Sequence, residues 1–515
     1  MNPGSASLNA ASLFVDRHLA EGRGGRTAFR HSGHALTYVA LAEQVHRAGN
    51  ALAALGVEIE NRVLLVLDDA PAFAAVFWGA ARLGAVAVPL NSLMSDDEYL
   101  FVLGDSRAKV VVAEPAVAER LGALRHRCPW LRAVVAAGAA PGALALDDLL
   151  AKASPELPAA PTSGEDVMYW GYTSGSTGVP KAAVHSHADF VAAADLVGVG
   201  VFGLGPADLV FSASKMYFAF GLGNSLYFPA RVGAASVLVR ERLTPERAFE
   251  VIAAERPTVF FAVATLYARM LQVADAARRY DLSSLRLCVS SGEALPPAVF
   301  DGWKARFGLE LTDVVGSTEA LHDFIANRPG AVRRGSSGQA VPGYELRLVD
   351  DEGRDVAGGV VGHLLIKGPT TAPYYWNRLE RTRATMLGEW LRTGDMFSRD
   401  ADGYYYFAGR ADDMLKVGGM WVSPAEVEAR LVEHPAVLEA GVAGRPDADG
   451  LIKPHACVVL KPGETASPAL LEDVAAFARA GLAGYKVPRW IEAVPDLPKT
   501  ATGKIQRFRL RRSSA

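Results

Sequence analysis

The sequence predicts an α/β protein with a large N-terminal domain of stacked α/β layers, a β-rich subdomain and a small α+β C-terminal domain. A chain of 515 residues is too long for one hydrophobic core. Apolar strand-like runs alternate with helical stretches up to about residue 330, and short strands separated by polar turns follow after about residue 335. Hydrophobic residues make up 50% and charged residues 21% of the chain, so an ordered globular protein is expected.

The first β-α-β unit combines a strand at 63–67, a helix at 71–83 and a strand at 85–89. Runs that are apolar on both faces are typical of parallel strands covered by helices. The same alternation predicts strands at 235–239, 259–262 and 285–289, with a helix at 266–273. These units form the expected stacked layers.

The β-rich subdomain is predicted from strands at 344–349, 362–367 and 404–407, which polar turns separate. The C-terminal unit follows with a helix at 424–433, strands at 440–443 and 454–460, and a helix at 467–480. The polar stretch 409–413 is short and lacks proline, which indicates a hinge rather than a tether. The predicted domains are therefore 1–411 and 412–515.

Composition argues against several classes of partner. Lys plus Arg number 53 against 56 Asp plus Glu, a net charge of −3, and no basic stripe suggests a nucleic-acid surface. Cys128, Cys288 and Cys457 are far apart, so reduced, buried thiols are expected. Residues 1–20 lack a secretion signal and no run of 18 apolar residues occurs, so we expect a cytoplasmic protein with no membrane partner.

The stretch 172–181, Tyr-Thr-Ser-Gly-Ser-Thr-Gly-Val-Pro-Lys, has the residue types that bind a polyphosphate. Glycines let backbone N–H groups approach closely, hydroxyls donate hydrogen bonds and Lys181 adds a positive charge. The spacing is not that of a Walker A loop. On its own, such a run is also typical of a flexible linker.

Four further segments make the linker interpretation less favourable: Val315-Gly316-Ser317-Thr318-Glu319, Arg392-Thr393-Gly394-Asp395, the stretch 409–416 and the stretch 498–504. The five segments, in this order, resemble the adenylate-forming superfamily of acyl-CoA synthetases, carrier-protein adenylation domains and luciferases. A closer resemblance, to benzoate-CoA ligases, lies in the stretches 219–224, 316–322, 421–424 and 449–454.

The resemblance implies a two-step reaction and a mobile C-terminal domain. A carboxylate attacks the α-phosphate of ATP to give an acyl-adenylate and pyrophosphate, and a thiol then displaces AMP. It implies ATP, Mg²⁺ and either coenzyme A or the phosphopantetheine of an acyl carrier protein as cofactors, with a small aromatic carboxylic acid as substrate.

Residue by residue, the resemblance makes Lys504 the cation between carboxylate and α-phosphate, Glu319 the Mg²⁺ ligand and Asp412 the hinge. Lys416 is the catalytic lysine of the second step, in which Gly418 and Gly419 line the pantetheine tunnel. The expected nucleotide contacts are Thr173, Ser174, Gly175, Ser176, Thr177, Gly178, Lys181, Ser291, Gly292, Glu293, Val315, Gly316, Ser317, Thr318, Asp395 and Arg410. Without the motifs, Lys504 would be interpreted as an exposed lysine on the C-terminal tail and Glu319 as a solvated glutamate at a helix start. Asp395 and Arg410 would be interpreted as turn residues.

The expected acid pocket comprises Ala219, Phe220, Ser291, Gly292, Gly316, His322 and Asp323. Phe220 and the glycines suit a flat ring, although a core aromatic is the alternative for Phe220. Phe220 stands where benzoate ligases commonly have tyrosine, and Asp323 where an aliphatic residue is common. If Asp323 faces the ring, its carboxylate needs a partner such as an amino or hydroxyl substituent or His322. If it faces solvent, nothing follows for selectivity.

Other functions remain open at this stage. The acceptor is coenzyme A or a carrier protein, or a nitrogen or oxygen nucleophile intercepts the adenylate. A non-catalytic nucleotide-binding homologue is a further alternative, although the joint presence of Lys504, Glu319, Asp395 and Arg410 argues against it. His185 and His187 have a metal-like spacing but no matching ligand nearby, which disfavours zinc.

Overall fold

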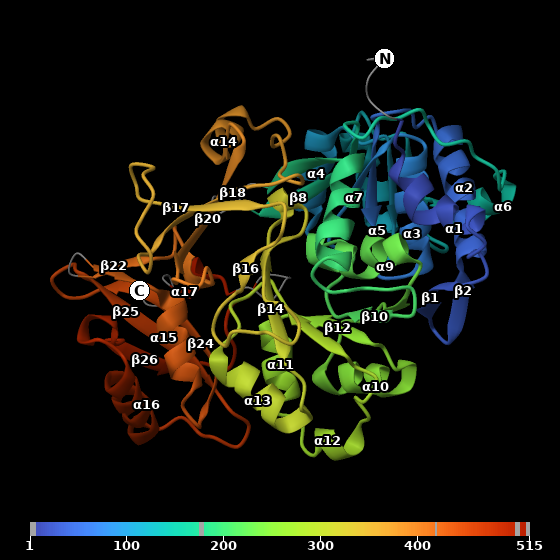
Figure 1. Cartoon of the computed structure of the whole chain (residues 1–515). Helices are drawn as coiled ribbons and strands as arrows, with labels where there is room; N and C mark the ends of the chain where they lie inside the picture. The colour runs from blue at the N-terminus through green and yellow to red at the C-terminus, as the bar shows by residue number, and fades with distance from the viewer. Residues whose placement is uncertain (1–6, 175–179, 418–419, 500–504, 511–515) are drawn as a thin grey trace.

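In the computed structural model the described residues are 7–174, 180–417, 420–499 and 505–510. They form an α/β protein in which the C-terminal unit, orange and red in Figure 1, lies beside helices α11 and α13 (Ala264–Met270 and Pro297–Phe307). No helix in these ranges has the length and apolarity needed to cross a bilayer.

The first large sheet has the strand order β7-β6-β5-β3-β4-β8-β9. Its strands are β3 (Arg62–Val66), β4 (Val86–Pro89), β5 (Val110–Ala113), β6 (Ala133–Ala136), β7 (Leu144–Ala145), β8 (Val167–Ser174) and β9 (Pro180–Ser186). The associated helices are α2 (Tyr38–Ala54), α3 (Pro71–Arg82), α4 (Asp96–Ser106), α5 (Pro115–Leu124), α6 (Leu146–Lys152) and α7 (His187–Ala193). Strands β3 and β4 pair in parallel, which confirms the predicted β-α-β unit.

The second large sheet has the order β16-β15-β14-β13-β12-β10-β11-β1-β2. Its strands are β1 (Thr27–His31), β2 (His34–Thr37), β10 (Leu209–Ser212), β11 (Ala235–Leu238), β12 (Val259–Ala262), β13 (Leu287–Ser290), β14 (Leu311–Gly316), β15 (Asp323–Ala326) and β16 (Gln339–Ala340). Besides α11 and α13, its helices are α8 (Ala219–Leu222), α9 (Phe228–Val232), α10 (Pro245–Glu255) and α12 (Ala276–Arg279).

An aromatic cluster joins these two layers. Trp78 on α3, Phe190 on α7 and Tyr227 before α9 are fully buried, and the Phe190 and Tyr227 rings lie 4.8 Å apart. Burial of such large apolar side chains drives the two sheets together. Cys128, Cys288 and Cys457 are buried free thiols, as predicted.

The β-rich subdomain has β18 (Gly362–Lys367) between β17 (Glu345–Val349) and β20 (Trp390–Arg399), while β19 (Met386–Leu387) and β21 (Tyr405–Arg410) pair with β20. The predicted antiparallel pairing of the first two strands is confirmed. Helix α14 (Leu379–Thr385) precedes β19.

The C-terminal unit contains β22 (Leu415–Val417), β23 (Met420–Val422), α15 (Pro424–Val432), β24 (Val437–Pro446), β25 (Ile452–Leu460), α16 (Pro468–Gly481), β26 (Trp490–Ala493) and α17 (Arg507–Leu510). An ion-pair group connects it to the rest of the molecule: Arg269 on α11 donates to Glu439 on β24 at 3.0 Å, and Lys499 pairs with the same carboxylate. The division at residue 411 remains a prediction.

Candidate active site

The site lies where parallel strands of the second sheet end. β12, β13 and β14 run in parallel, so their carboxyl ends share one edge. Ser291 and Gly292 follow β13, Gly316 ends β14, and Asp323 begins the antiparallel strand β15 opposite Gly316. Open α/β sheets bind ligands at such an edge. Residues far apart in the sequence thereby meet.

The phosphate-type loop connects two antiparallel strands. Thr173 near the end of β8 pairs with Lys181 on β9, so the chain reverses between them. Gly175, Ser176, Thr177 and Gly178 lie outside the described residues, and the side chain of Ser174 is likewise not described. Their phosphate contacts therefore remain predictions, while Lys181 is placed at the base of the loop.

Lys181 forms a compact polar cluster with Glu319 and Tyr375. The Lys181 Nζ lies 3.2 Å from Glu319 Oε1, and the Tyr375 hydroxyl donates to the same oxygen at 2.6 Å. Burial alone would raise the pKa of Glu319, but the Lys181 charge and the Tyr375 hydrogen bond bring it below its usual value. Glu319 is therefore ionised at neutral pH, while burial and Glu319 raise the pKa of Tyr375 and keep its proton in place.

Tyr375 has no recognisable signal in the sequence. It lies in a loop 56 residues from Glu319, and no local pattern distinguishes it from the aromatic residues on either side, Tyr374 and Trp376. Only the fold, which places the loop against β9 through a bridge between Ala183 and Tyr375, shows the contact.

Local structure holds Glu319 in place. The Ser317 Oγ accepts a hydrogen bond from Ala320 N–H at 3.2 Å and caps the short 3₁₀ turn Thr318–Ala320. One ring nitrogen of His185 lies 2.7 Å from Thr318 O and the other 3.0 Å from Asp189 Oδ2. His187 Nδ1 accepts a hydrogen bond from Ala10 N–H. His185 therefore supports the turn that carries Glu319, and His187 binds the N-terminal segment.

Asp395 and Arg410, the predicted ribose pair, are direct partners on β20 and β21. The Arg410 guanidinium donates to Asp395 Oδ1 at 2.8 Å and to Thr393 O at 3.1 Å. Gly394, which lies between Thr393 and Asp395 on β20, has φ +78°, and a Cβ there would lie 2.8 Å from Arg410 Nη2. The structure thus brings this pair together at a position that requires glycine.

The residues of the predicted acid pocket also come together. The rings of Phe220 and His322 lie 5.6 Å apart, and His322 Nε2 lies 3.3 Å from Phe220 O. Asp323 is 1% exposed, and its Oδ1 accepts a long hydrogen bond of 3.4 Å from Ser291 Oγ. Asp323 therefore faces the protein interior, which answers the orientation question that the sequence left open. Ala219 begins the short helix α8 that carries Phe220.

Glu293 has a structural partner. Its Oε2 accepts a hydrogen bond from Thr265 N–H at 2.9 Å, at the start of α11, and burial raises its pKa. Its predicted nucleotide contact would have to be made alongside this hydrogen bond.

Several predicted residues belong to the C-terminal unit. Lys504, Gly418 and Gly419 lie outside the described residues. Lys416 occupies the middle of β22, although its side chain is not described. Asp412 is exposed in the turn between β21 and β22. The roles predicted for these residues remain predictions.

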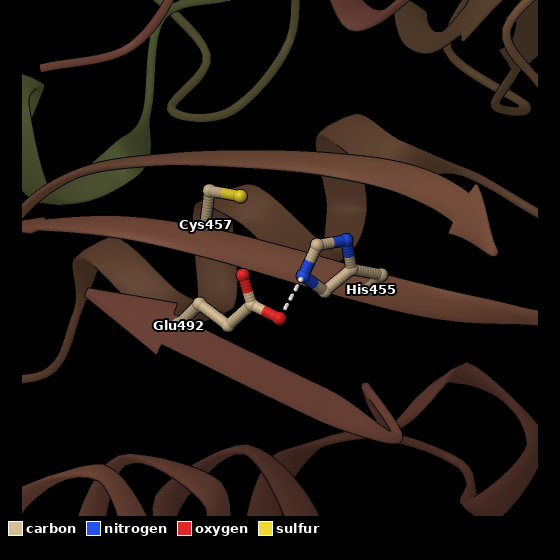
Figure 2. Close-up of side chains that lie close together, drawn as sticks. All are labelled: His455, Cys457 and Glu492. Carbon is tan, nitrogen blue, oxygen red and sulfur yellow. Dashed lines mark ion pairs between the residues drawn. The ribbon is translucent and has the colours of Figure 1, made fainter. Parts of the chain in front are cut away.

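The C-terminal unit also holds a group that the sequence did not suggest, His455, Cys457 and Glu492 on the adjacent strands β25 and β26 (Figure 2). His455 Nε2 lies 3.3 Å from Glu492 Oε1, and Arg445 donates to that same oxygen at 3.1 Å. A guanidinium on the carboxylate would repel a metal cation. We therefore assign this group to an ion-pair network of the sheet.

Comparisons with known proteins place this geometry in context. Residues 16–376 match the AMP-binding enzyme family and residues 426–504 match its C-terminal domain. The chain is 48% identical over 505 residues to a benzoate–CoA ligase from Thauera aromatica, covering 98% of this chain and 95% of that protein. It is 46% identical over 511 residues to a 4-hydroxybenzoate–CoA/benzoate–CoA ligase from Rhodopseudomonas palustris, covering 98% and 94%.

Two solved structures are similar along their whole length. An anthranilate CoA ligase in complex with anthranoyl-AMP superimposes with a TM-score of 0.95 at 43% identity, covering 98% of this chain and 97% of the other. A benzoate CoA ligase from Burkholderia xenovorans LB400 gives 0.91 at 44% identity, covering 98% and 100%. The predicted fold class, with its large N-terminal and small C-terminal parts, is thereby confirmed.

Proposed function

Because the chain belongs to the AMP-binding enzyme family, we propose that it is an ATP-dependent ligase that joins an aromatic carboxylic acid to the thiol of coenzyme A and releases AMP. The observation that carries the proposal is the shared sheet edge, where Glu319 with its cationic partner lies next to the Phe220 and His322 pocket. Relatives named as benzoate–CoA ligases, at 46% and 48% identity over 98% of this chain, support the substrate class.

The chemistry explains the need for cations at this edge. An oxygen of the acid attacks the α-phosphorus of ATP, and the bond to pyrophosphate breaks. The sulfur of the thiol then attacks the carbonyl carbon, and the carbon–oxygen bond to AMP breaks. The first step brings two anions together, so positive charge must neutralise them. We assign that role to Lys504, and contact with the β- and γ-phosphates to Lys181.

Mg²⁺ fits the residues around Glu319. An ionised carboxylate together with phosphate oxygens is the ligand set that Mg²⁺ prefers, and the low pKa of Glu319 provides the charge. When bound, the ion would supply neutralising charge to the phosphates. Lys181 and Tyr375 fix the direction in which the carboxylate points.

Replacing Tyr375 by phenylalanine should weaken the Mg²⁺ dependence rather than abolish the reaction. The variant loses the 2.6 Å hydrogen bond that orients Glu319, a charge-assisted interaction of roughly 1.5–3 kcal/mol. We expect the Mg²⁺ concentration for half-maximal pyrophosphate exchange to rise by about 10- to 150-fold, since Glu319 keeps its charge but not its fixed orientation. An unchanged Mg²⁺ requirement would contradict the positioning role.

The remaining site residues complete the proposal. Asp395 accepts from the ribose hydroxyls and Arg410 donates to them. A C-terminal domain that begins at residue 412 turns about Asp412 after the first step, so that Lys504 withdraws and Lys416 approaches. Gly418 and Gly419 then leave room for the pantetheine arm.

A substrate screen tests the function. AMP release is measured with ATP, Mg²⁺ and coenzyme A over benzoate, its amino, hydroxy and halo derivatives, cinnamates and short aliphatic acids. We expect aromatic acids to be used at least about tenfold better than aliphatic ones, because an aromatic wall and glycine floor suit a flat ring. A preference for aliphatic acids would contradict the pocket assignment, and no AMP release or pyrophosphate exchange with any acid would favour a non-catalytic nucleotide binder.

A second comparison decides the acceptor. Turnover of the best acid is measured with free coenzyme A and with a carrier protein that bears its phosphopantetheine arm. We expect the higher kcat/KM with coenzyme A; a higher value with the carrier protein would contradict that part of the proposal. Mass spectrometry of the product would reveal transfer to nitrogen or oxygen instead.

A further inference from the structure

Asp323 is a buried carboxylate with unused hydrogen-bonding capacity. It is 1% exposed, and its contact with Ser291 Oγ is long at 3.4 Å. Within the described part of the chain, its Oδ2 has no hydrogen bond of good geometry, although His322 Nδ1 lies only 2.9 Å away. A buried acceptor without a donor destabilises the folded protein, because it has lost its hydrogen bonds to water. A ligand that brings a donor would offset this destabilisation.

The neighbouring histidine shows which kind of donor fits. His322 Nε2 lies 3.3 Å from Phe220 O, and a carbonyl oxygen can only accept, so Nε2 carries the hydrogen. In the neutral ring, Nδ1 is then an acceptor that faces the Asp323 carboxylate. His322 Nδ1 lies 2.9 Å from Asp323 Oδ2, yet neither atom has a hydrogen bond of good geometry among the described residues.

Gly316 allows the Asp323 carboxylate to pack closely against the backbone of β14. A Cβ at Gly316 would lie 2.7 Å from Asp323 Oδ1 and 2.6 Å from His322 O, closer than carbon can approach either oxygen. Ser291, which contacts the same carboxylate, follows the adjacent strand β13 at the same sheet edge. The Asp323 carboxylate therefore lies against Gly316 and Ser291, two small residues of the proposed acid pocket.

We propose that Asp323, together with His322, selects aromatic acids that carry a primary amino group on the ring. The two N–H bonds of an arylamine match the carboxylate and the imidazole acceptor, whereas a hydroxyl offers one hydrogen and a methyl group none. This inference rests on the proposed function, since it identifies the substrate class of the same pocket. It gives Asp323, where benzoate ligases commonly carry an aliphatic residue, a direct contact with substrate.

The test compares substituents of similar size. The kcat/KM for AMP release is measured with each aminobenzoate isomer, the corresponding methylbenzoate and the corresponding hydroxybenzoate. We expect one aminobenzoate to exceed its methyl counterpart by about 100-fold, because a site that hydrogen-bonds a substrate rejects an analogue that leaves its buried polar groups unpaired. Asp323→Leu should lower this ratio by about 100-fold, and Asp323→Asn, which keeps one acceptor oxygen, should give an intermediate ratio.

Asp313→Asn is the matched control. Asp313 is a buried carboxylate on β14, the strand paired with β15, and is 6% exposed. Its replacement should leave the amino-to-methyl ratio within about twofold of the wild-type value.

Three outcomes would overturn the inference while leaving the proposed function intact. They are equal use of amino and methyl compounds by the wild type, a preference for the hydroxy compound, and an unchanged ratio in both Asp323 variants. Failure of every aromatic acid to release AMP would instead overturn the proposed function itself.

Discussion

Replacing Lys504 by alanine is expected to lower the formation of the aryl-adenylate by about 100- to 1000-fold, the usual effect of removing one group that stabilises developing charge. The substrate carboxylate and the α-phosphate approach each other as anions, and Lys504 is the cation assigned between them. Thiolysis of a supplied aryl-adenylate by coenzyme A should stay within a few-fold of wild type, because that step brings no new anionic phosphate to the carbonyl.

The two half-reactions are measured separately, by acid-dependent pyrophosphate exchange and by coenzyme A-dependent release of AMP from synthetic adenylate. Lys461→Ala, in the loop after β25, removes a lysine from the same C-terminal unit and controls for the loss of charge alone. It should leave both rates within about twofold of wild type. Equal losses of both half-reactions in Lys504→Ala would contradict the division of roles between the two lysines.

Replacing Glu319 by glutamine is expected to reduce adenylation by about 100-fold or more at physiological Mg²⁺. Glutamine keeps the size of the side chain and an oxygen for the Tyr375 hydroxyl, so the fold around the 3₁₀ turn should persist. It removes the negative charge that pairs with Lys181 and that would hold the metal. Raising the Mg²⁺ concentration should therefore restore part of the activity.

The measurement is pyrophosphate exchange as a function of Mg²⁺ concentration. Glu310→Gln is the matched control, because Glu310 lies just before β14 and pairs with Lys304 outside the site. Loss of this partly exposed ion pair should change the rate of pyrophosphate exchange by less than about twofold. Wild-type activity of Glu319→Gln at all Mg²⁺ concentrations would show that the carboxylate does not hold the metal.

The local sequence pattern predicts the bounds of the buried apolar strands well. It predicts poorly the bounds of strands that pack against segments distant in the sequence. The apolar strands Val259–Ala262 and Gly362–Lys367 agree with the prediction to the residue, and β13 begins two residues later than predicted. Strand β24, Val437–Pro446, extends beyond the predicted 440–443. Gly444, just after the predicted end, resembles a turn residue in the sequence. The structure shows why glycine stands there: a Cβ at Gly444 would lie 3.0 Å from Leu415 Cδ2, so glycine allows a segment distant in the sequence to pack closely.

Other strands are difficult to predict because they contain polar motif residues. β20, Trp390–Arg399, contains Thr393, Gly394 and Asp395, whose residue types indicate a functional motif, and the structure places that motif within a strand. Thr173 and Ser174 likewise end β8 and Lys181 lies on β9, so the phosphate-type loop is shorter than its sequence pattern suggests. A motif gives the residue types but not the backbone that carries them.

The motifs identify residues that the structure brings together. Phe220, His322 and Asp323 lie in contact, and Asp395 and Arg410 are partners, while their roles remain predictions. Tyr375 was not predictable, since its role depends on a loop brought to Glu319 by the fold. The burial of Asp323 was also beyond the sequence, because a residue that follows a turn can face either side of the strand it begins.

The most direct test of the proposed reaction follows the oxygen atoms of the acid. The enzyme is given an aromatic acid whose carboxylate carries ¹⁸O, with ATP, Mg²⁺ and coenzyme A, and the AMP is analysed by mass spectrometry. Attack of the carboxylate on the α-phosphorus predicts that each AMP molecule contains one oxygen from the acid. Formation of the thioester with unlabelled AMP, or with ADP and labelled inorganic phosphate, would contradict an adenylate intermediate.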